Sequence, residues 1–209
     1  MHFIGDLSEN DATQLALRAI EARVGILEFG SGGSTQLLAA HSRPTVPMRS
    51  VDTDPLWVQK TQANLKRLGI LRKSPVEFRQ WLPLSVPLER KAHEAELVDG
   101  EWDLVLVDGL RDMRKHFARI AWRKLAVGGW MLWHDCRRPI DFEEMVQFVL
   151  AHGPEIELFQ PSVGESNLAA YRKRSYLQRE NWQTGKQVWE LGGGNPPDPL
   201  PWPSAGSSC

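Results

Sequence analysis

The feature that most constrains the fold is an alternation between two kinds of segment, from about residue 24 to residue 172. Short apolar runs have the length of strands, and helical patterns with an apolar stripe separate most of them. This alternation favours parallel βαβ units, in which helices cover both faces of one sheet. The expected strands are 24–29, 48–52, 76–78, 104–108, 130–133, 156–159 and 168–171. The fold class predicted is therefore α/β.

Helical periodicity marks the segments between the strands. Pro55 suits the first turn of a helix, where its missing N–H costs nothing. Gly128 and Gly129 are expected to close a helix over residues 113–125. The other helices expected are 10–23, 88–98 and 142–150. No helical pattern separates the last two strands, which predicts an antiparallel hairpin at the edge of the sheet.

The chain length of 209 residues suits one buried domain with extensions. We expect an N-terminal helical extension over residues 1–23, a central domain over 24–172, and a C-terminal extension over 173–209. The last of these contains GGGNPPDPLPWPSAG, which can continue neither a helix nor a strand. An extended tail is the interpretation of that stretch.

The charge balance excludes some partners. The 25 basic and 26 acidic residues leave a net charge of -1, too little to draw the chain onto nucleic acid or an anionic membrane. No apolar stretch approaches the roughly 20 residues of a membrane span, and the N-terminus lacks the pattern of a signal peptide. Cys136 and Cys209 cannot form a disulfide framework or a CxxC zinc site. A cytoplasmic protein with a small-molecule partner is expected.

The segment ILEFGSGGST, residues 26–35, places three glycines directly after the first strand. Ligands of open α/β sheets bind at the carboxyl ends of the strands, and glycine lets a ligand approach the backbone there. A Walker loop would need a lysine, but none follows Gly33 before Lys60. Thr35 stands where a nicotinamide fingerprint needs a small residue. These departures disfavour both phosphate-binding alternatives.

Two acids near this turn favour a cationic nucleoside. Glu28 would repel a pyrophosphate but can pair with a ligand that carries a positive charge. Asp52 closes the second strand, where a carboxylate can accept both hydroxyls of a ribose. Asp54, just before Pro55, is the expected helix N-cap, which leaves Asp52 for the ligand.

Four segments in order, ILEFGSGGST, SVDTDP, WDLVLVDG and LAVGGWMLWHD, resemble the successive motifs of class I S-adenosylmethionine-dependent methyltransferases. The resemblance covers about residues 24–172. It implies a Rossmann-like, doubly wound, seven-stranded sheet of order 3-2-1-4-5-7-6 with strand 7 antiparallel. It also implies cofactor contacts from Glu28, Gly30, Ser31, Gly32 and Ser34 to the methionine part, from Asp52 to the ribose, and from Gln80 and Trp81 to the adenine.

Groups that act on the methyl acceptor should follow strands 4 and 5, where Asp108, His134 and Asp135 stand. Asp108 and Asp135 resemble the Mg²⁺ ligands of catechol, caffeoyl and macrolide-sugar O-methyltransferases. Cys136 departs from that pattern, because metal-using relatives place Asn or Asp there, and Leu110 departs from the macrolide-sugar type. Without metal, His134 would be the general base. Asp108 could instead line the methyl end of the cofactor.

Basic residues cluster beyond these strand ends. His116 is expected on a solvated basic helix with Arg111, Arg114, Lys115 and Arg119, with recognition of an acidic substrate as the alternative. Arg137 and Arg138 could hold a phosphate or carboxylate of the substrate.

The sequence thus predicts an S-adenosylmethionine-dependent methyltransferase that acts on a small molecule, with a hydroxyl oxygen as the acceptor. Two alternatives stay open, a non-catalytic binding module of the same fold and a nicotinamide-dependent oxidoreductase. Acceptor contacts could also come from the N-terminal helix or a second subunit, which makes a homodimer a candidate assembly.

Overall fold

The computed structural model describes residues 7–109, 111–160, 162 and 166–174, which belong to one compact unit over residues 1–175. The helices and strands in chain order are α1 (Glu9–Glu21), β1 (Ile26–Phe29), α2 (Gly33–His41), β2 (Met48–Asp52), α3 (Pro55–Arg67), η1 (Ile70–Arg72), β3 (Val76–Gln80), α4 (Pro87–Leu97), β4 (Trp102–Val107), η2 (Arg111–Met113), α5 (Arg114–Trp122), β5 (Leu125–Trp133), α6 (Pro139–His152), η3 (Gly153–Glu155), β6 (Ile156–Gln160) and β7 (Ala169–Lys173).

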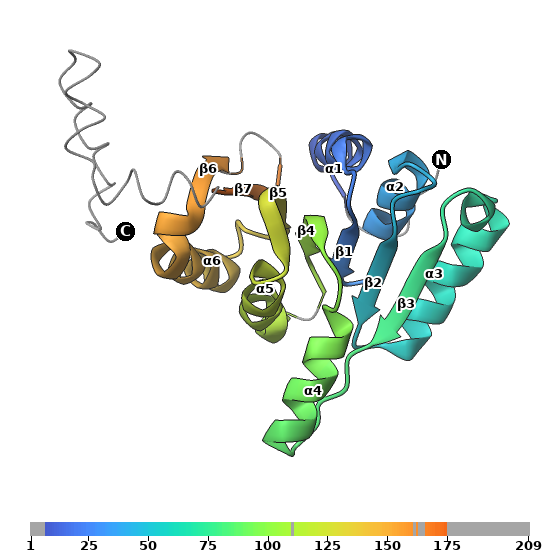
Figure 1. Cartoon of the computed structure of the whole chain (residues 1–209). Coiled ribbons are helices and arrows are strands. Elements are labelled where there is room, and N and C mark those ends of the chain that lie inside the picture. Colours follow the sequence, from blue (N-terminus) through green and yellow to red (C-terminus); the bar gives the residue numbers. More distant parts are fainter. Residues whose placement is uncertain (1–6, 110, 161, 163–165, 175–209) are drawn as a thin grey trace, which may run out of the picture. The chain divides into compact units, whose positions relative to one another are not determined.

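The strands form one seven-stranded sheet in the order β3-β2-β1-β4-β5-β7-β6 (Figure 1). The first five strands are parallel, whereas β7 runs antiparallel to both β5 and β6. The predicted strand order, the reversed strand and the hairpin at the edge are all confirmed. The sheet therefore has its topological switch between β1 and β4, and the first glycine turn lies at that point.

Alternate residues of the central strands are buried on opposite faces of the sheet. Leu27 and Phe29 of β1 join a core cluster with Phe117 of α5, and the Phe29 and Phe117 rings stack with centroids 4.6 Å apart. Ile26 joins a second cluster with Leu15 of α1. Helices thus cover both faces, as the continuous apolar runs predict (Figure 1).

One boundary prediction is wrong. Helix α5 ends at Trp122, and β5 already begins at Leu125, where the sequence pattern continued the helix. The register explains the difference, since Trp102 pairs with Leu125 but Leu104 pairs with Trp130, so β5 contains an irregularity with extra residues. Gly128, at φ 77°, lies within this irregularity and does not end the helix.

The predicted extensions are only partly described. Helix α1 confirms a helix before the first strand, and strand β7 includes Lys173. The Gly/Pro-rich stretch lies outside the described residues. In the part of the chain that is described, the longest helix is α6 with 14 residues, and none has the length and apolar character of a bilayer span.

Candidate active site

The carboxylate of Glu28 lies beneath the glycine turn. Its side chain is fully buried in β1 and accepts three hydrogen bonds from hydroxyl groups. Ser34 Oγ and Thr35 Oγ1, from the first turn of α2, donate at 2.6 and 2.7 Å, and Ser50 Oγ of β2 donates at 2.7 Å. The glycine turn and the two flanking elements are therefore joined through one carboxyl group.

These neutral donors only partly offset the cost of burying a charge. Burial raises the pKa of Glu28 from 4.5 to about 7, although the hydroxyl hydrogen bonds act in the opposite direction. Both oxygens of Glu28 already have partners within the protein. The expected direct contact between Glu28 and a ligand stays a prediction, and Thr35 and Ser50 are partners that the sequence reasoning missed.

Asp52, at the end of β2, lies in the same network. Its carboxylate accepts from the Ser31 N–H at 2.6 Å and from the Asp54 N–H at 2.9 Å. Ser50 already donates its proton to Glu28, so Ser31 Oγ must be the donor in the 2.9 Å contact between the two serine hydroxyls. Burial raises the pKa of Asp52 against the effect of the backbone donors.

The helix cap beside Asp52 is confirmed. Asp54 is the N-cap of α3, and its side chain accepts from the Leu56 N–H at 2.9 Å. Because the Asp54 side chain caps α3, Asp52 is free to contact the glycine turn, where its Oδ2 accepts from the Ser31 N–H, while its Oδ1 accepts from the Asp54 N–H.

Glycine at position 30 was expected to let a ligand approach the backbone, but the structure shows a different reason for it. Gly30 has φ 100°, and a Cβ there would lie 2.3 Å from the backbone N of Gly109. The turn after β1 therefore packs backbone against backbone on the turn after β4. At Gly30 the missing side chain makes room for the protein itself.

The two residues expected at the adenine lie at the end of β3. Gln80 is exposed, whereas Trp81 is 7 % exposed and meets Phe117 edge-on, with ring centroids 6.0 Å apart. The backbone N–H of Trp81 donates to the backbone carbonyl of Asp52 at 2.8 Å, which holds the ends of β2 and β3 together. The Trp81 ring is a core residue in this structure, and its contact with adenine stays a prediction.

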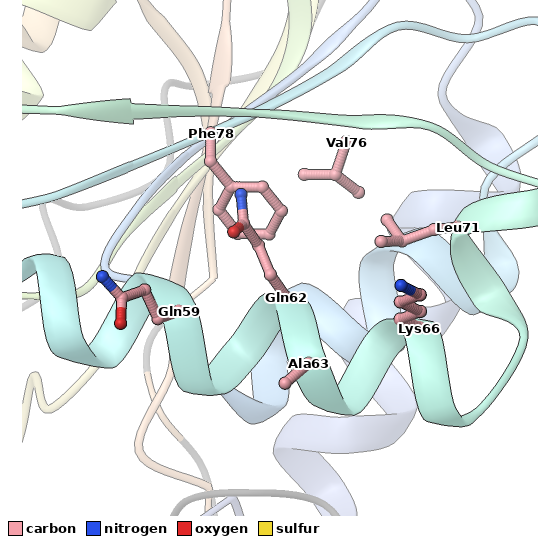
Figure 2. Close-up of a pocket in the computed structure, with 7 residues that line it drawn as sticks. All are labelled: Gln59, Gln62, Ala63, Lys66, Leu71, Val76 and Phe78. Carbon is pink, nitrogen blue, oxygen red and sulfur yellow. The ribbon is translucent and has the colours of Figure 1, made fainter.

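A separate groove lies at the edge of the sheet, between α3 and β3 (Figure 2). Both polar and apolar side chains line it, and none of the predicted site residues does. The lining residues are Gln59, Gln62, Ala63, Lys66, Leu71, Val76 and Phe78.

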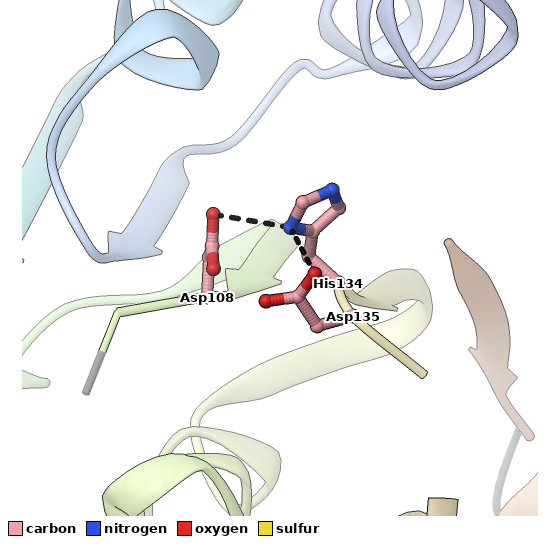
Figure 3. Close-up of side chains that lie close together, drawn as sticks. All are labelled: Asp108, His134 and Asp135. Carbon is pink, nitrogen blue, oxygen red and sulfur yellow. Dashed lines mark ion pairs between the residues drawn. The ribbon is translucent and has the colours of Figure 1, made fainter. Parts of the chain in front are cut away.

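A second cluster of ionisable groups lies at the carboxyl ends of β4 and β5 (Figure 3). His134 Nδ1 is 3.4 Å from Asp108 Oδ2 and 3.7 Å from Asp135 Oδ1. Asp135 has φ 59°, the only positive value at a non-glycine residue in the described chain. This backbone conformation ends the strand. The consecutive side chains of His134 and Asp135 therefore lie close together, instead of pointing to opposite faces of the sheet as they would within a strand.

The three predicted residues are therefore brought together, with a fourth that was not predicted. Asp11 of α1 is buried, and its Oδ2 lies 3.8 Å from His134 Nε2. Burial lowers the pKa of His134, but the surrounding carboxylates outweigh burial and raise the pKa above its usual value. Burial would raise the pKa of Asp108, yet His134 and Arg114 hold it below the usual range.

Arg114 corrects the expectation of a solvated basic helix. Its side chain is only 3 % exposed, and its Nη2 lies 3.1 Å from Asp108 Oδ1 and 2.8 Å from Asp135 Oδ2. Its Nη1 lies 3.0 Å from Asp141 Oδ1 of α6. Arg114 shares a helix face with Phe117 and Ala121, three and seven residues later, and this periodicity was the overlooked signal.

His116, expected on the same solvated surface, is partly exposed and pairs with Glu94 of α4 at 2.7 Å. Arg137 donates from Nε to Ser162 Oγ at 2.8 Å, and Arg138 lies 2.7 Å from Asp135 Oδ2. The predicted contacts of Arg137 and Arg138 with a substrate anion stay predictions.

Comparison with known proteins agrees with this architecture. A family model described as a methyltransferase domain matches residues 27–136, more than half of the chain. The chain belongs to this methyltransferase family. A search of curated proteins finds no match.

Solved structures with the same fold include several methyltransferases. An O-methyltransferase from Streptomyces achromogenes involved in tomaymycin synthesis, in complex with SAM, has a TM-score of 0.63 and is 16 % identical over 81 % of this chain and 82 % of its own. A Bacillus cereus O-methyltransferase in complex with SAH has a TM-score of 0.63, 18 % identity and coverages of 80 % and 83 %. An SAH-bound methyltransferase from Podospora anserina has a TM-score of 0.60 and is 18 % identical over 81 % of this chain and 80 % of its own.

The acidic cluster of this methyltransferase offers a set of possible metal ligands, since Asp108, His134 and Asp135 place one ligand atom each within 4.8 Å of one another. The two carboxylates already contact other groups of the protein, however. Asp135 Oδ1 accepts from Asn167 Nδ2 at 2.8 Å, and Oδ2 faces both Arg114 and Arg138. Asp135 thus has three contacts with protein cations or donors, Asp108 also contacts Arg114, and this arrangement does not fit Mg²⁺.

Proposed function

We propose that this protein is an S-adenosylmethionine-dependent methyltransferase that methylates a small molecule, with a hydroxyl oxygen as the acceptor. One observation carries the proposal, the pair of acids Glu28 and Asp52 beside the glycine turn. In the described residues, their side-chain contacts are with hydroxyl and N–H groups and not with Lys, Arg or His. Negative charge without an internal cation favours a cationic ligand.

The groups around the turn suit S-adenosylmethionine. A carboxylate has about four acceptor positions, and the two N–H donors found for Asp52 leave positions for ribose hydroxyls. The first N–H groups of α2 have no partner within the helix and can bind a carboxylate such as that of a methionine. The cofactor supplies a methyl group on a sulfonium, which is already activated for displacement by an oxygen.

The cluster at β4 and β5 supports proton removal from the acceptor. We propose that neutral His134 receives the hydroxyl proton of the acceptor. Asp108 and Asp135, close to Nδ1, would stabilise the imidazolium that forms. The two clusters follow adjacent strands, β1 and β4, and the contact between Gly30 and Gly109 brings their turns together.

A small-molecule acceptor is proposed over nucleic acid because the net charge is only -1. The oxygen acceptor is supported by the O-methyltransferases with the same fold, from Streptomyces achromogenes and Bacillus cereus. The cytoplasmic location and the homodimer stay predictions from the sequence.

Isothermal titration calorimetry with S-adenosylmethionine, its demethylated product and NAD⁺ tests the proposal. We expect binding of the first two and none of NAD⁺. Transfer of a labelled methyl group to a panel of phenols, catechols and sugars then tests catalysis. Cofactor binding without transfer to any acceptor would favour the non-catalytic binding module, and NAD⁺ binding alone would overturn the proposal.

A further inference from the structure

We propose that the guanidinium of Arg114 provides the positive charge that metal-dependent O-methyltransferases obtain from a divalent ion, so that the acceptor site of this protein works without metal. The inference rests on the proposed methyltransferase function, because it concerns the end of the site where the acceptor would lie. It assigns Arg114 a role as a positioning residue.

The geometry of Arg114 is that of a bridging cation. A single nitrogen, Nη2, contacts Asp108 Oδ1 at 3.1 Å and Asp135 Oδ2 at 2.8 Å, so it joins these two carboxylates as a shared cation would. The contact of Nη1 with Asp141 holds the plane of the guanidinium in place. Because the side chain is 3 % exposed, solvent does not compete for these contacts.

Electrostatics make Arg114 and a dication mutually exclusive. An ion coordinated by Asp108 and Asp135 would lie within a few Å of the guanidinium, in a buried region where like charges repel strongly. Moving Arg114 away would instead leave the buried carboxyl group of Asp141 without this cation. Either arrangement costs free energy that the present one avoids.

The residue after Asp135 also lacks the chemistry of a metal ligand. The Cys136 thiol donates to the Asn167 carbonyl at 3.2 Å and so points toward the backbone before β7. A thiol is in any case a poor ligand for a hard cation. The Asn167 amide instead donates to Asp135, which reinforces the orientation that Arg114 imposes.

Direct measurement of Mn²⁺ binding by electron paramagnetic resonance tests this inference without any cofactor or acceptor. We expect no specific binding to the wild-type protein at millimolar Mn²⁺. In Arg114→Met, Mn²⁺ affinity should rise by about tenfold or more, and the further substitution Asp135→Asn should remove the gain. Arg138→Met is the matched control, because this exposed arginine contacts the same oxygen of Asp135, and it should not create a site.

Wild-type binding of Mn²⁺ that Asp135→Asn abolishes would overturn the inference, and so would a folded Arg114→Met variant without a gain. If Arg114→Met does not fold, the wild-type titration and Arg114→Lys decide, since neither is expected to bind. In methyl-transfer assays EDTA should leave the wild-type rate unchanged. Arg114→Met should lower kcat with little change in the KM for S-adenosylmethionine, and Arg114→Lys should restore part of kcat. If the proposed function is wrong, calorimetry will instead show that the protein does not bind S-adenosylmethionine.

Discussion

The two acidic clusters of this protein lie at neighbouring strand ends but contact different kinds of partner. At β1 and β2, Glu28 and Asp52 are surrounded by hydroxyl and backbone N–H groups. At β4 and β5, Asp108 and Asp135 contact Arg114, whose side chain is almost fully buried. In the described residues the first cluster contacts no cationic side chain, whereas the second contains its own cation.

This difference assigns separate tasks to chemically similar residues. Carboxylates that lack an internal cation are suited to a positively charged ligand, such as a sulfonium nucleoside. Carboxylates that already contact a guanidinium are suited to orienting a neighbouring base, which in the proposed mechanism is His134. The number of acids at a strand end is therefore a poor guide to metal binding unless the basic residues that face them are known.

The largest effect should come from removing the internal cation. Arg114→Met leaves three carboxylates without their shared partner and should lower the free energy of unfolding by about 3–5 kcal/mol, measured by urea denaturation. Arg138→Met, which removes an exposed contact with Asp135, should cost at most about 1 kcal/mol. Equal losses from the two substitutions would contradict the distinction between a buried and a peripheral cation.

The first cluster should reveal itself through pH. The pKa of Glu28 is about 7 in the folded protein against an ordinary 4.5, so the folded state binds this proton more tightly. Its stabilising contribution is full below the unfolded value and disappears as pH rises through about 7. Between about pH 5 and about pH 8, wild type should lose about 2–3 kcal/mol more than Glu28→Gln in urea denaturation. A constant difference between the two proteins would refute this account.

Asp52 should affect the cofactor more than the fold. Asp52→Asn removes the charge and one acceptor site for the ribose, so S-adenosylmethionine affinity should fall by about tenfold in calorimetry. The matched control is Asp54→Asn, because asparagine caps a helix as well as aspartate does. An equal loss in this control would mean that the position of α3, and not the Asp52 carboxylate, determines affinity.

The smallest effect concerns the link between the two acids of the first cluster. Ser31→Ala removes the hydroxyl that donates to Ser50 and should cost about 1 kcal/mol of unfolding free energy. The backbone N–H of Ser31 would still donate to Asp52. Thermal denaturation of this variant beside wild type would measure the loss, and an unchanged midpoint would show that the serine pair does not contribute.

The sheet was predictable because its signals are local. Continuous apolar runs marked the buried strands, and the absence of a helical pattern before β7 marked the reversed hairpin. The start of β5 at Leu125 was missed because an irregular strand with two glycines has neither helical nor strand periodicity. Asp54 was correctly identified as a cap because capping depends on its immediate neighbours.

The partners within the site were harder to predict, because they come from distant parts of the chain. Arg114 was assigned to a charged surface. The three acids that it contacts come from separate parts of the chain, after β4, after β5 and in α6. Glu28 was recognised from its position at the strand end, yet the hydroxyls that surround it depend on the packing of β2 and α2. The sequence shows which charged residues are present, whereas the packing of the elements determines which of them contact one another.

The backbone contact between Gly30 and Gly109 has a consequence for how the protein would work. A Cβ on Gly109 would lie 3.1 Å from the Cα of Gly30, so no side chain separates the two turns. Asp108 directly precedes one turn and Ser31 directly follows the other, and neither turn can shift without moving its neighbour. The spacing between donor and acceptor would thus be preorganised during folding, as an in-line transfer requires.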